Sequence, residues 1–204
     1  GAAQATERED GPAPDTVFTG EEACRAAINW TLNGLYAGRR DLYLRMPFDD
    51  SSRVYSDDNT SRIHYLLSRQ VAVSAGEYLY RQHDASATHR FDLRRLDFLA
   101  ANRSLRSLLE QHQANADILM ACEEHCWRNY VGLYLQFQRH WSAFSPQAHQ
   151  QIRNAFKVSL QAMRPERLPR GLRRSPSWLF VRPFSLFVAY RQVLSVLKKI
   201  LKPF

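Results

Sequence analysis

The sequence predicts a predominantly helical α+β fold, and three observations lead to this prediction. Of the 204 residues, 45% are hydrophobic and 24% are charged, which is typical of a globular chain. From Asp92 onward, apolar residues recur with the 3.6-residue period of amphipathic helices. Before Asp92, the runs VAVSA (71–75) and EYLYRQ (77–82) alternate as strands do. No stretch approaches the ~20 apolar residues of a membrane-spanning helix, so an integral membrane protein is not expected.

The N-terminal region is expected to become ordered at Thr19. Residues 1–16 are rich in alanine, proline and acidic residues without a periodic pattern, which predicts a flexible leader. Thr19 and Glu22 then have the spacing of a capping box, in which each side chain accepts a hydrogen bond from the backbone of the other. A helix is therefore predicted from Thr19 to about Thr31.

Three short elements are predicted between this helix and the two alternating runs. The run NGLYAG (33–38) is apolar and bounded by turn residues, which favours a buried strand. RRDLYLRM (39–46) predicts one or two helical turns that end at Pro47. Acidic and hydroxyl side chains in residues 56–61 then open a further helix.

The second half of the chain is predicted to be mainly helical. Its leucines and aromatic residues keep the helical period, and Ser145 followed by Pro146 is a typical helix start. The predicted segments are helices at about 92–109, 118–141 and 147–163, a Pro/Arg/Gly-rich linker at 163–177 and a final helix at 183–201.

Basic residues are concentrated at the C-terminus. The chain carries 28 Lys and Arg against 20 Asp and Glu, and residues 164–204 alone hold ten bases and one acid. The final helix separates a basic face from an apolar face, which predicts contact with an anionic membrane surface through residues 183–204. The alternative is that the apolar face packs back onto the helices before it. The apolar face comprises Phe187, Tyr190, Val193, Leu194, Leu197, Ile200, Leu201 and Phe204.

The stretch 54–90 holds the side chains best suited to chemistry. Asp57 and Asp58 lie at the start of a predicted helix, where an acidic residue often does no more than cap the helix. Beyond the two predicted strands, the chain reaches a loop rich in hydrogen-bonding groups. A carboxylate near such a loop is suited to act as a general base toward a polyhydroxy substrate. The polar side chains of the loop are Arg81, Gln82, His83, Ser86, Thr88 and His89.

The order of these motifs resembles the C-terminal half of the family 2 glycosyltransferases, especially the non-processive enzymes that build bacterial surface polysaccharides. NGLYAGRRDL (33–42), Phe48, YSDDNTS (55–61), VAVSA and YLYRQHDASAT (78–88) follow one another as in that family, with similar separations. The segment FTGEEA also resembles the helix that precedes these motifs. The resemblance covers about residues 17–110 and implies short strands of a partial glycosyltransferase A-type fold.

The resemblance also implies an activity. Members of the family move a sugar from a nucleotide-sugar donor to a saccharide acceptor with inversion, and an acid of the motif deprotonates the acceptor hydroxyl. Asp57 matches this general base, Asp58 matches the acid after it, and Ser56 replaces the usual Glu. Gly34 stands where the family usually has Lys. The implied substrate contacts are Arg81, His83, Ser86, Thr88 and Tyr55.

The donor-binding half of the family is not recognisable in this sequence. No Asp-x-Asp motif occurs, and in the family this motif holds the Mg²⁺ or Mn²⁺ and the diphosphate. We therefore expect no cofactor in this chain and no transfer by the chain alone. The implied location is the cytoplasm, peripheral to the inner face of the membrane. The expected parts are a leader (1–16), an acceptor-side segment (17–110), a helical annex (111–163) and a basic linker with the amphipathic helix (164–204).

A second hypothesis is a non-catalytic, basic helical protein that binds nucleic acid or a protein partner. Arginine supplies 24 of the 28 basic residues, which suits phosphate binding, but the apolar face of the final helix makes nucleic acid the weaker choice. Cys122, His125 and Cys126 have helical spacing and could begin a metal site, although core packing is the commoner role of such cysteines. Core packing is also predicted for Trp127, Tyr130, Tyr134, Phe137 and Trp141.

Overall fold

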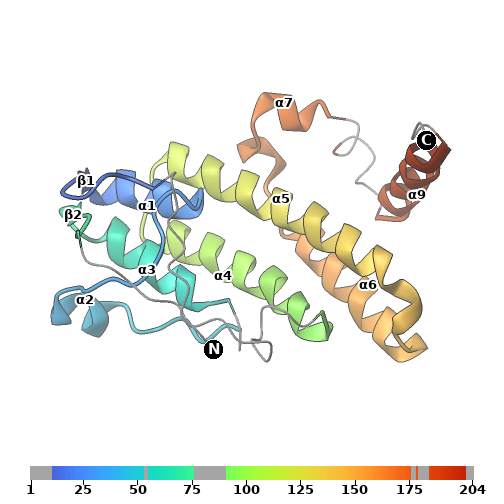
Figure 1. The fold of residues 1–204 in the computed structure, drawn as a ribbon, viewed down its shortest axis with the longest axis horizontal. Helices are drawn as coiled ribbons and strands as arrows, with labels where there is room; N and C mark the ends of the chain where they lie inside the picture. The colour runs from blue at the N-terminus through green and yellow to red at the C-terminus, as the bar shows by residue number, and fades with distance from the viewer. Residues whose placement is uncertain (1–10, 53–54, 76–90, 176–177, 179–183, 201–204) are drawn as a thin grey trace.

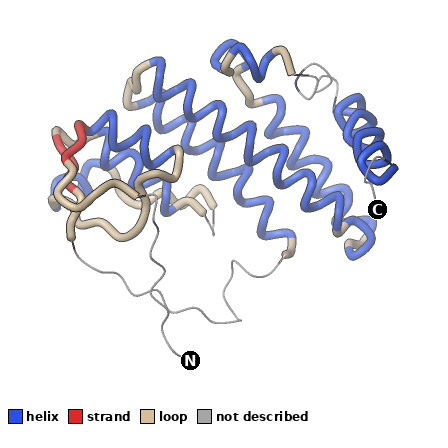
Figure 2. Tube along the Cα trace, turned by 45° about the horizontal axis from the view of Figure 1, so that its top comes forward, coloured by secondary structure: helices blue, strands red, loops and turns tan. Residues whose placement is uncertain are grey.

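The protein consists mainly of helices, with one small antiparallel sheet at one end (Figures 1 and 2). The predicted predominantly helical α+β class is therefore confirmed. Within the described ranges, no helix combines the length and the apolar character needed to cross a bilayer. The structure is a computed structural model that describes residues 11–52, 55–75, 91–175, 178 and 184–200.

The sheet has two short strands, β1 (Val17–Thr19) and β2 (Gln70–Ala72), paired in antiparallel orientation. Strand β2 confirms part of the strand predicted at 71–75. The strand predicted at 77–82 lies outside the described residues. The partner of β2 is instead the segment just before the first helix, which carries too few residues to show an alternating pattern.

Helix α1 (Gly20–Ile28) begins at the predicted capping box. The N–H of Thr19 donates to Glu22 Oε2 at 2.8 Å, and the N–H of Glu22 donates to Thr19 Oγ1 at 3.3 Å. Order begins earlier than predicted, however, because the N–H of Asp15 donates to the carbonyl of Val73 at 2.9 Å. The end of the predicted leader is thus held by Val73, the residue directly after β2.

Helix α3 (Asp57–Leu66), which the sequence predicts, packs closely against α1. The closeness depends on Gly20, because a Cβ atom there would overlap the carbonyl oxygens of Tyr65 and Ser68. Those two atoms belong to the backbone and cannot move aside as a side chain can. Glycine is therefore required at the first turn of α1.

The segment between α1 and α3 differs from the prediction in one element. Residues 33–38, all of them described, form no strand, and Gly34 has a φ of +117° that a strand does not allow. The segment is fixed instead by Tyr36, which binds His64. The short helix α2 (Arg40–Arg45) that follows is as predicted.

Three long helices, α4, α5 and α6, cross the centre of the molecule (Figure 1). They confirm the helices predicted at about 92–109, 118–141 and 147–163, and Asn115 and Ser145 cap α5 and α6. The linker predicted at 163–177 is wrong in part, because its described residues include two helical turns and the buried Leu168. The elements are η1 (Leu93–Leu96), α4 (Asp97–Gln111), α5 (Ala116–Arg139), η2 (Trp141–Ala143), α6 (Pro146–Gln161), η3 (Pro165–Arg167), α7 (Arg170–Arg173) and α9 (Phe184–Ile200).

Two hydrophobic cores share helix α5. The first core joins its N-terminal half to α1, α3 and α4, mainly through small and aliphatic side chains. The second, which we call the aromatic core, joins its C-terminal half to α6 and α9 and contains the predicted aromatic face. The first core includes Ala23, Cys24, Ala27, Ile28, Ile63, Leu105, Leu109, Ile118, Cys122 and Cys126, and the aromatic core includes Leu99, Trp127, Tyr130, Leu133, Phe137, Ile152, Phe156, Leu160, Leu168 and Phe187.

Candidate functional site

A wide surface groove of about 1600 Å³ lies beside α3, at the end of the molecule that carries the sheet. One wall is the segment from Trp30 to Arg45, and the other is formed by α3, β2 and the residues between them. Asp58, the partly buried member of the predicted catalytic pair, lines this groove. We therefore take the groove as the candidate site.

The structure separates the two adjacent carboxylates at the start of α3. Asp57 is exposed and does not line the groove, whereas Asp58 is half-buried and does. Burial raises the pKa of the Asp58 carboxyl, and the positive charge of Arg62 partly opposes this. Consecutive helix residues point in different directions, so only one of the two can serve a single site. The geometry favours Asp58 over Asp57.

Arg62 lies one helical turn after Asp58 and is only 4% exposed. Its Nε donates to the carbonyl of Ala27 and its Nη1 to Asn59 Oδ1, both at 3.4 Å. Burial lowers the pKa of the guanidinium, and the Asp58 carboxylate counteracts this effect. Sequence reasoning missed Arg62, although its i,i+4 spacing from Asp58 was a usable signal.

Trp30 covers the outer side of Arg62 and lines the groove. The guanidinium carbon lies 5.2 Å from the centre of the indole ring, which is cation–π distance. Trp30 has a φ of +63° just after the C-terminus of α1, at a position that usually holds glycine. Its side chain nevertheless stays 45% exposed. The chain thus accepts a strained backbone that leaves a large aromatic surface at the groove.

His64 holds the two walls of the groove together. Its Nε2 lies 2.6 Å from the carbonyl oxygen of Met46, which can only accept, so Nε2 carries the proton. In the neutral ring, Nδ1 then accepts from the hydroxyl of Tyr36 at 2.8 Å. Tyr43 packs edge-on against the same ring, with centroids 4.6 Å apart. These contacts fix the segment that carries Gly34 and α2 against α3.

Asn59 also fixes the first turn of α3 through hydrogen bonds to neighbouring segments. Its Nδ2 donates to Asp49 Oδ2 at 2.7 Å and to the carbonyl of Ala101 at 2.9 Å. The loop before α3 is thereby tied to α4 next to Asp58. The carboxylate at 58 consequently sits on a rigid part of the helix, as a reacting group requires.

Among the other predicted site residues, the structure describes Tyr55, which does not line the groove. Tyr55 turns toward α4, where its ring stacks on Phe98 with centroids 3.4 Å apart. Its φ of +78° produces this turn of the chain immediately before α3. Arg81, His83, Ser86 and Thr88 lie outside the described residues.

Gly34 lies where the resemblance would place a lysine. It lines the groove with a φ of +117°, which side-chain-bearing residues rarely adopt. A lysine, which the family usually has at this position, would be strained on this backbone. Any phosphate contact from this wall would have to come from another residue.

The cysteine and histidine cluster in α5 belongs to the first core, as the packing interpretation predicted. Cys122 and Cys126 are each 1% exposed, and their sulfur atoms lie 3.9 Å apart. The hydrogen bond between them and their burial raise the pKa of the Cys122 thiol. Burial, with the nearby charge of Arg62, lowers the pKa of His125 to about 4. Among the described residues, no group of three or more His, Cys, Asp or Glu side chains is placed to hold a metal ion.

Comparisons of the chain with protein-family models, curated proteins and solved structures give no match. The likeness to family 2 glycosyltransferases therefore rests on the order and spacing of the sequence motifs alone.

Proposed function

We propose that this chain forms the acceptor side of an inverting glycosyltransferase and that Asp58 is its general base. The observation that carries the proposal is the different placement of the two acidic residues. Asp58 faces the groove in a half-buried position, and burial raises its pKa. A general base is most effective when its pKa approaches the working pH, so this environment suits the role.

The chemistry assigned to Asp58 is a single proton transfer. The acceptor hydroxyl oxygen attacks the anomeric carbon of the donor sugar, and its proton passes to the Asp58 carboxylate. The bond between that carbon and the donor phosphate breaks on the opposite side, so the configuration inverts. The charge of Arg62 opposes protonation of Asp58 in the resting state, which keeps the base available.

The groove is also suited to hold a saccharide. Trp30 offers an exposed aromatic face beside the base, and the polar groups of the neighbouring wall can hydrogen-bond to sugar hydroxyls. The nucleotide-sugar donor and its Mg²⁺ or Mn²⁺ would be held by a donor-binding half of the kind that the family carries. A surface-polysaccharide acceptor and a position at the inner face of the membrane belong to the same proposal.

The test is sugar transfer by the full product of the gene that encodes this chain, with a panel of nucleotide sugars. Asp58→Asn should lower turnover by ~10²–10⁴-fold, the usual contribution of a general base. Asp57→Asn is the matched control and should keep near-normal turnover, since its side chain is exposed. The capping role expected for Asp57 is not observed, because Ser56 is the N-cap of α3 and no side chain caps this helix. Both variants should stay within ~1 kcal/mol of the wild-type stability.

Three results would contradict the proposal. Near-normal turnover of Asp58→Asn would remove this residue from the reaction. A selective loss in Asp57→Asn would return the role to the residue that the family motif matches. Absence of transfer from every nucleotide sugar tested, with the wild-type protein folded, would exclude the glycosyltransferase activity.

A further inference from the structure

Helix α9 carries two apolar faces, and only one of them is covered. Phe187 is fully buried in the aromatic core, with its ring centre 4.9 Å from that of Tyr134 and 5.6 Å from that of Tyr130. The sequence groups Val193 and Leu197 with Phe187 on a single apolar face. The structure divides this face, because both residues are largely exposed.

The exposed apolar side chains of α9 form a continuous outer face. At 100° per residue, positions 186, 193 and 197 fall within a narrow sector, and 196 lies next to it. These side chains are 44–57% exposed although the helix is docked. The outer face, as we use the term below, comprises Leu186, Val193, Val196 and Leu197.

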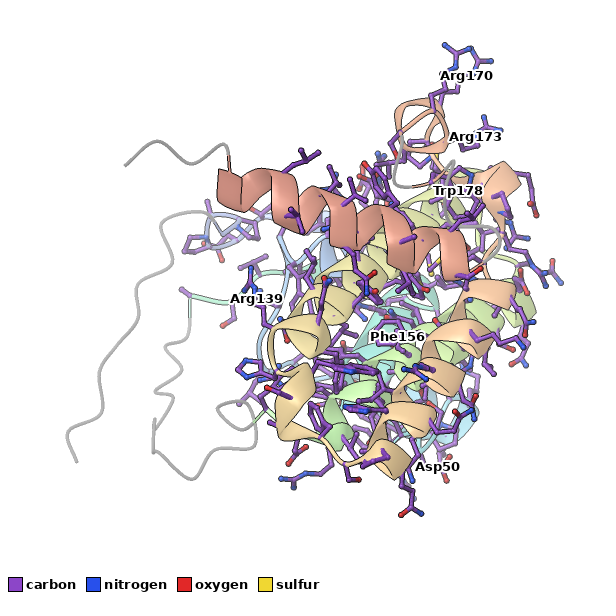
Figure 3. All side chains as sticks on the ribbon, turned by 90° about the vertical axis from the view of Figure 1, so that its right-hand side faces the viewer. Asp50, Arg139, Phe156, Arg170, Arg173 and Trp178 are labelled. Carbon is purple, nitrogen blue, oxygen red and sulfur yellow. The ribbon has the colours of Figure 1, made fainter. Side chains whose placement is uncertain are left out.

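Basic side chains extend from α7, the described helix that precedes α9 along the chain. Figure 3 shows Arg170 and Arg173 projecting from α7 away from the body of the molecule, and Figure 1 places α7 at the upper edge and α9 at the upper right. Arg174 is also exposed. Residues 164–204 together contribute ten bases and one acid, so this segment of the chain is strongly positive.

We propose that the outer face of α9, together with the arginines of α7, binds an anionic phospholipid bilayer. A helix that lies in the headgroup plane buries apolar side chains in the acyl boundary and places basic groups among anionic headgroups. The 17 residues of α9 extend over only about 25 Å at 1.5 Å per residue, so the helix lies along the surface and does not cross it. This inference deepens the membrane position given in the proposed function, but it uses no residue of the groove and its test does not depend on sugar transfer.

Charge decides between the bilayer and the other partners of an apolar helix face. A second copy of the chain would bring two strongly basic segments together, which is unfavourable. Nucleic acid would satisfy the arginines but would leave the aliphatic outer face without an apolar partner. An anionic bilayer complements both features at once.

The test is co-sedimentation of the full 204-residue chain with vesicles of phosphatidylcholine alone or with 40% phosphatidylglycerol. We expect binding to the anionic vesicles and little to the neutral ones. Arg170→Gln/Arg173→Gln should weaken binding about 30-fold, which follows from about 1 kcal/mol per basic residue near an anionic surface. Val196→Gln/Leu197→Gln should weaken it at least tenfold, because two apolar side chains no longer enter the bilayer.

Matched controls carry the same chemical changes at the opposite end of the molecule. Leu35→Gln/Leu44→Gln replaces two exposed leucines, and Arg25→Gln/Arg40→Gln replaces two exposed arginines, both outside α7 and α9. Both controls should bind as the wild type does, and circular dichroism should show that all four variants are folded. Equal binding to neutral and anionic vesicles, or wild-type binding by the outer-face variant, would overturn the proposal. So would wild-type dimers that the outer-face variant dissociates, or tight binding to a DNA duplex without binding to vesicles.

Discussion

The two cores that share helix α5 are built in different ways. The first core brings backbones close together, as at Gly20, and fills the small remaining space with alanine, cysteine and aliphatic side chains. The aromatic core is filled by large rings, and an open pocket of about 560 Å³ lies beside it between α5, α6 and α9. The first core therefore depends on the close approach of backbones, and the aromatic core depends on contacts between large rings.

The two cores also differ in the hydrogen bonding of their buried polar side chains. In the first core, Arg106 donates to both carboxylate oxygens of Glu123 at 2.8 and 3.1 Å, and both side chains are almost fully buried. Glu123 Oε1 also accepts from the backbone N–H of Arg164 at 2.9 Å. In the aromatic core, the hydroxyl of Tyr130 is buried and no hydrogen-bond partner is found for it in the described part of the chain. Asn102 Nδ2, next to Cys126 of the first core, is also buried without a partner among the described residues, so the difference between the cores lies in the buried ion pair of the first core.

The largest effect is expected from breaking the buried ion pair of the first core. Arg106→Met should lower the free energy of unfolding by about 3–5 kcal/mol, because it leaves the Glu123 carboxylate buried without its counter-charge. Arg106→Met/Glu123→Leu should recover part of this loss, since no isolated charge then remains. Urea denaturation followed by circular dichroism measures both. A double variant no more stable than Arg106→Met would contradict this account of the pair.

A second comparison tests whether the aromatic core and α9 unfold together. Phe156 and Phe187 are equally buried, yet Phe187 is the only fully buried side chain among those described in α9. Phe156→Ala should cost about 3–5 kcal/mol of global stability. Phe187→Ala should cost much less globally and should instead release α9, seen as faster hydrogen exchange in residues 184–200. Equal global losses would mean that α9 is an integral part of the core.

The smallest effects concern two glycines that differ only in their surroundings. Gly20→Ala should destabilise the protein by about 1–3 kcal/mol, because its Cβ meets backbone oxygen atoms of the α3 region. Gly132→Ala lies within α5, where a Cβ meets nothing within 4 Å, and it should stabilise by about 1 kcal/mol through helix propensity. Thermal melts of the two variants report both signs. Similar changes in melting temperature, in the same direction, would show that the close approach of α1 and α3 does not contribute to stability.

Elements with strong local signals were predictable from the sequence. The capping box at Thr19, the serine–proline start of α6 and the aromatic period of α5 depend on neighbours within a few residues, and all three are present. The segment 33–38 was mispredicted because Gly34 adopts a positive φ and Tyr36 finds its partner on a distant helix. Short apolar runs do not reveal which of these outcomes applies.

The candidate site was predictable in part. The motif order drew attention to Asp57 and Asp58, but local sequence cannot tell which of two consecutive helix residues faces a groove. That choice depends on the wall formed by Trp30 to Arg45, which is positioned by the His64 contacts. Arg62 was missed because its role arises from burial beneath Trp30, a tertiary property.

The hydrogen bond from Arg164 to Glu123 has a consequence for the order in which the protein forms during synthesis. Arg106 precedes Glu123 on the chain, whereas Arg164 follows it by 41 positions. At about 5–20 residues per second, a ribosome adds Arg164 about 2 to 8 s after Glu123. Arg106 is therefore available to pair with Glu123 before the backbone N–H of Arg164 has been made. The counter-charge of the Glu123 carboxylate is thus already present while the C-terminal helices are still being translated.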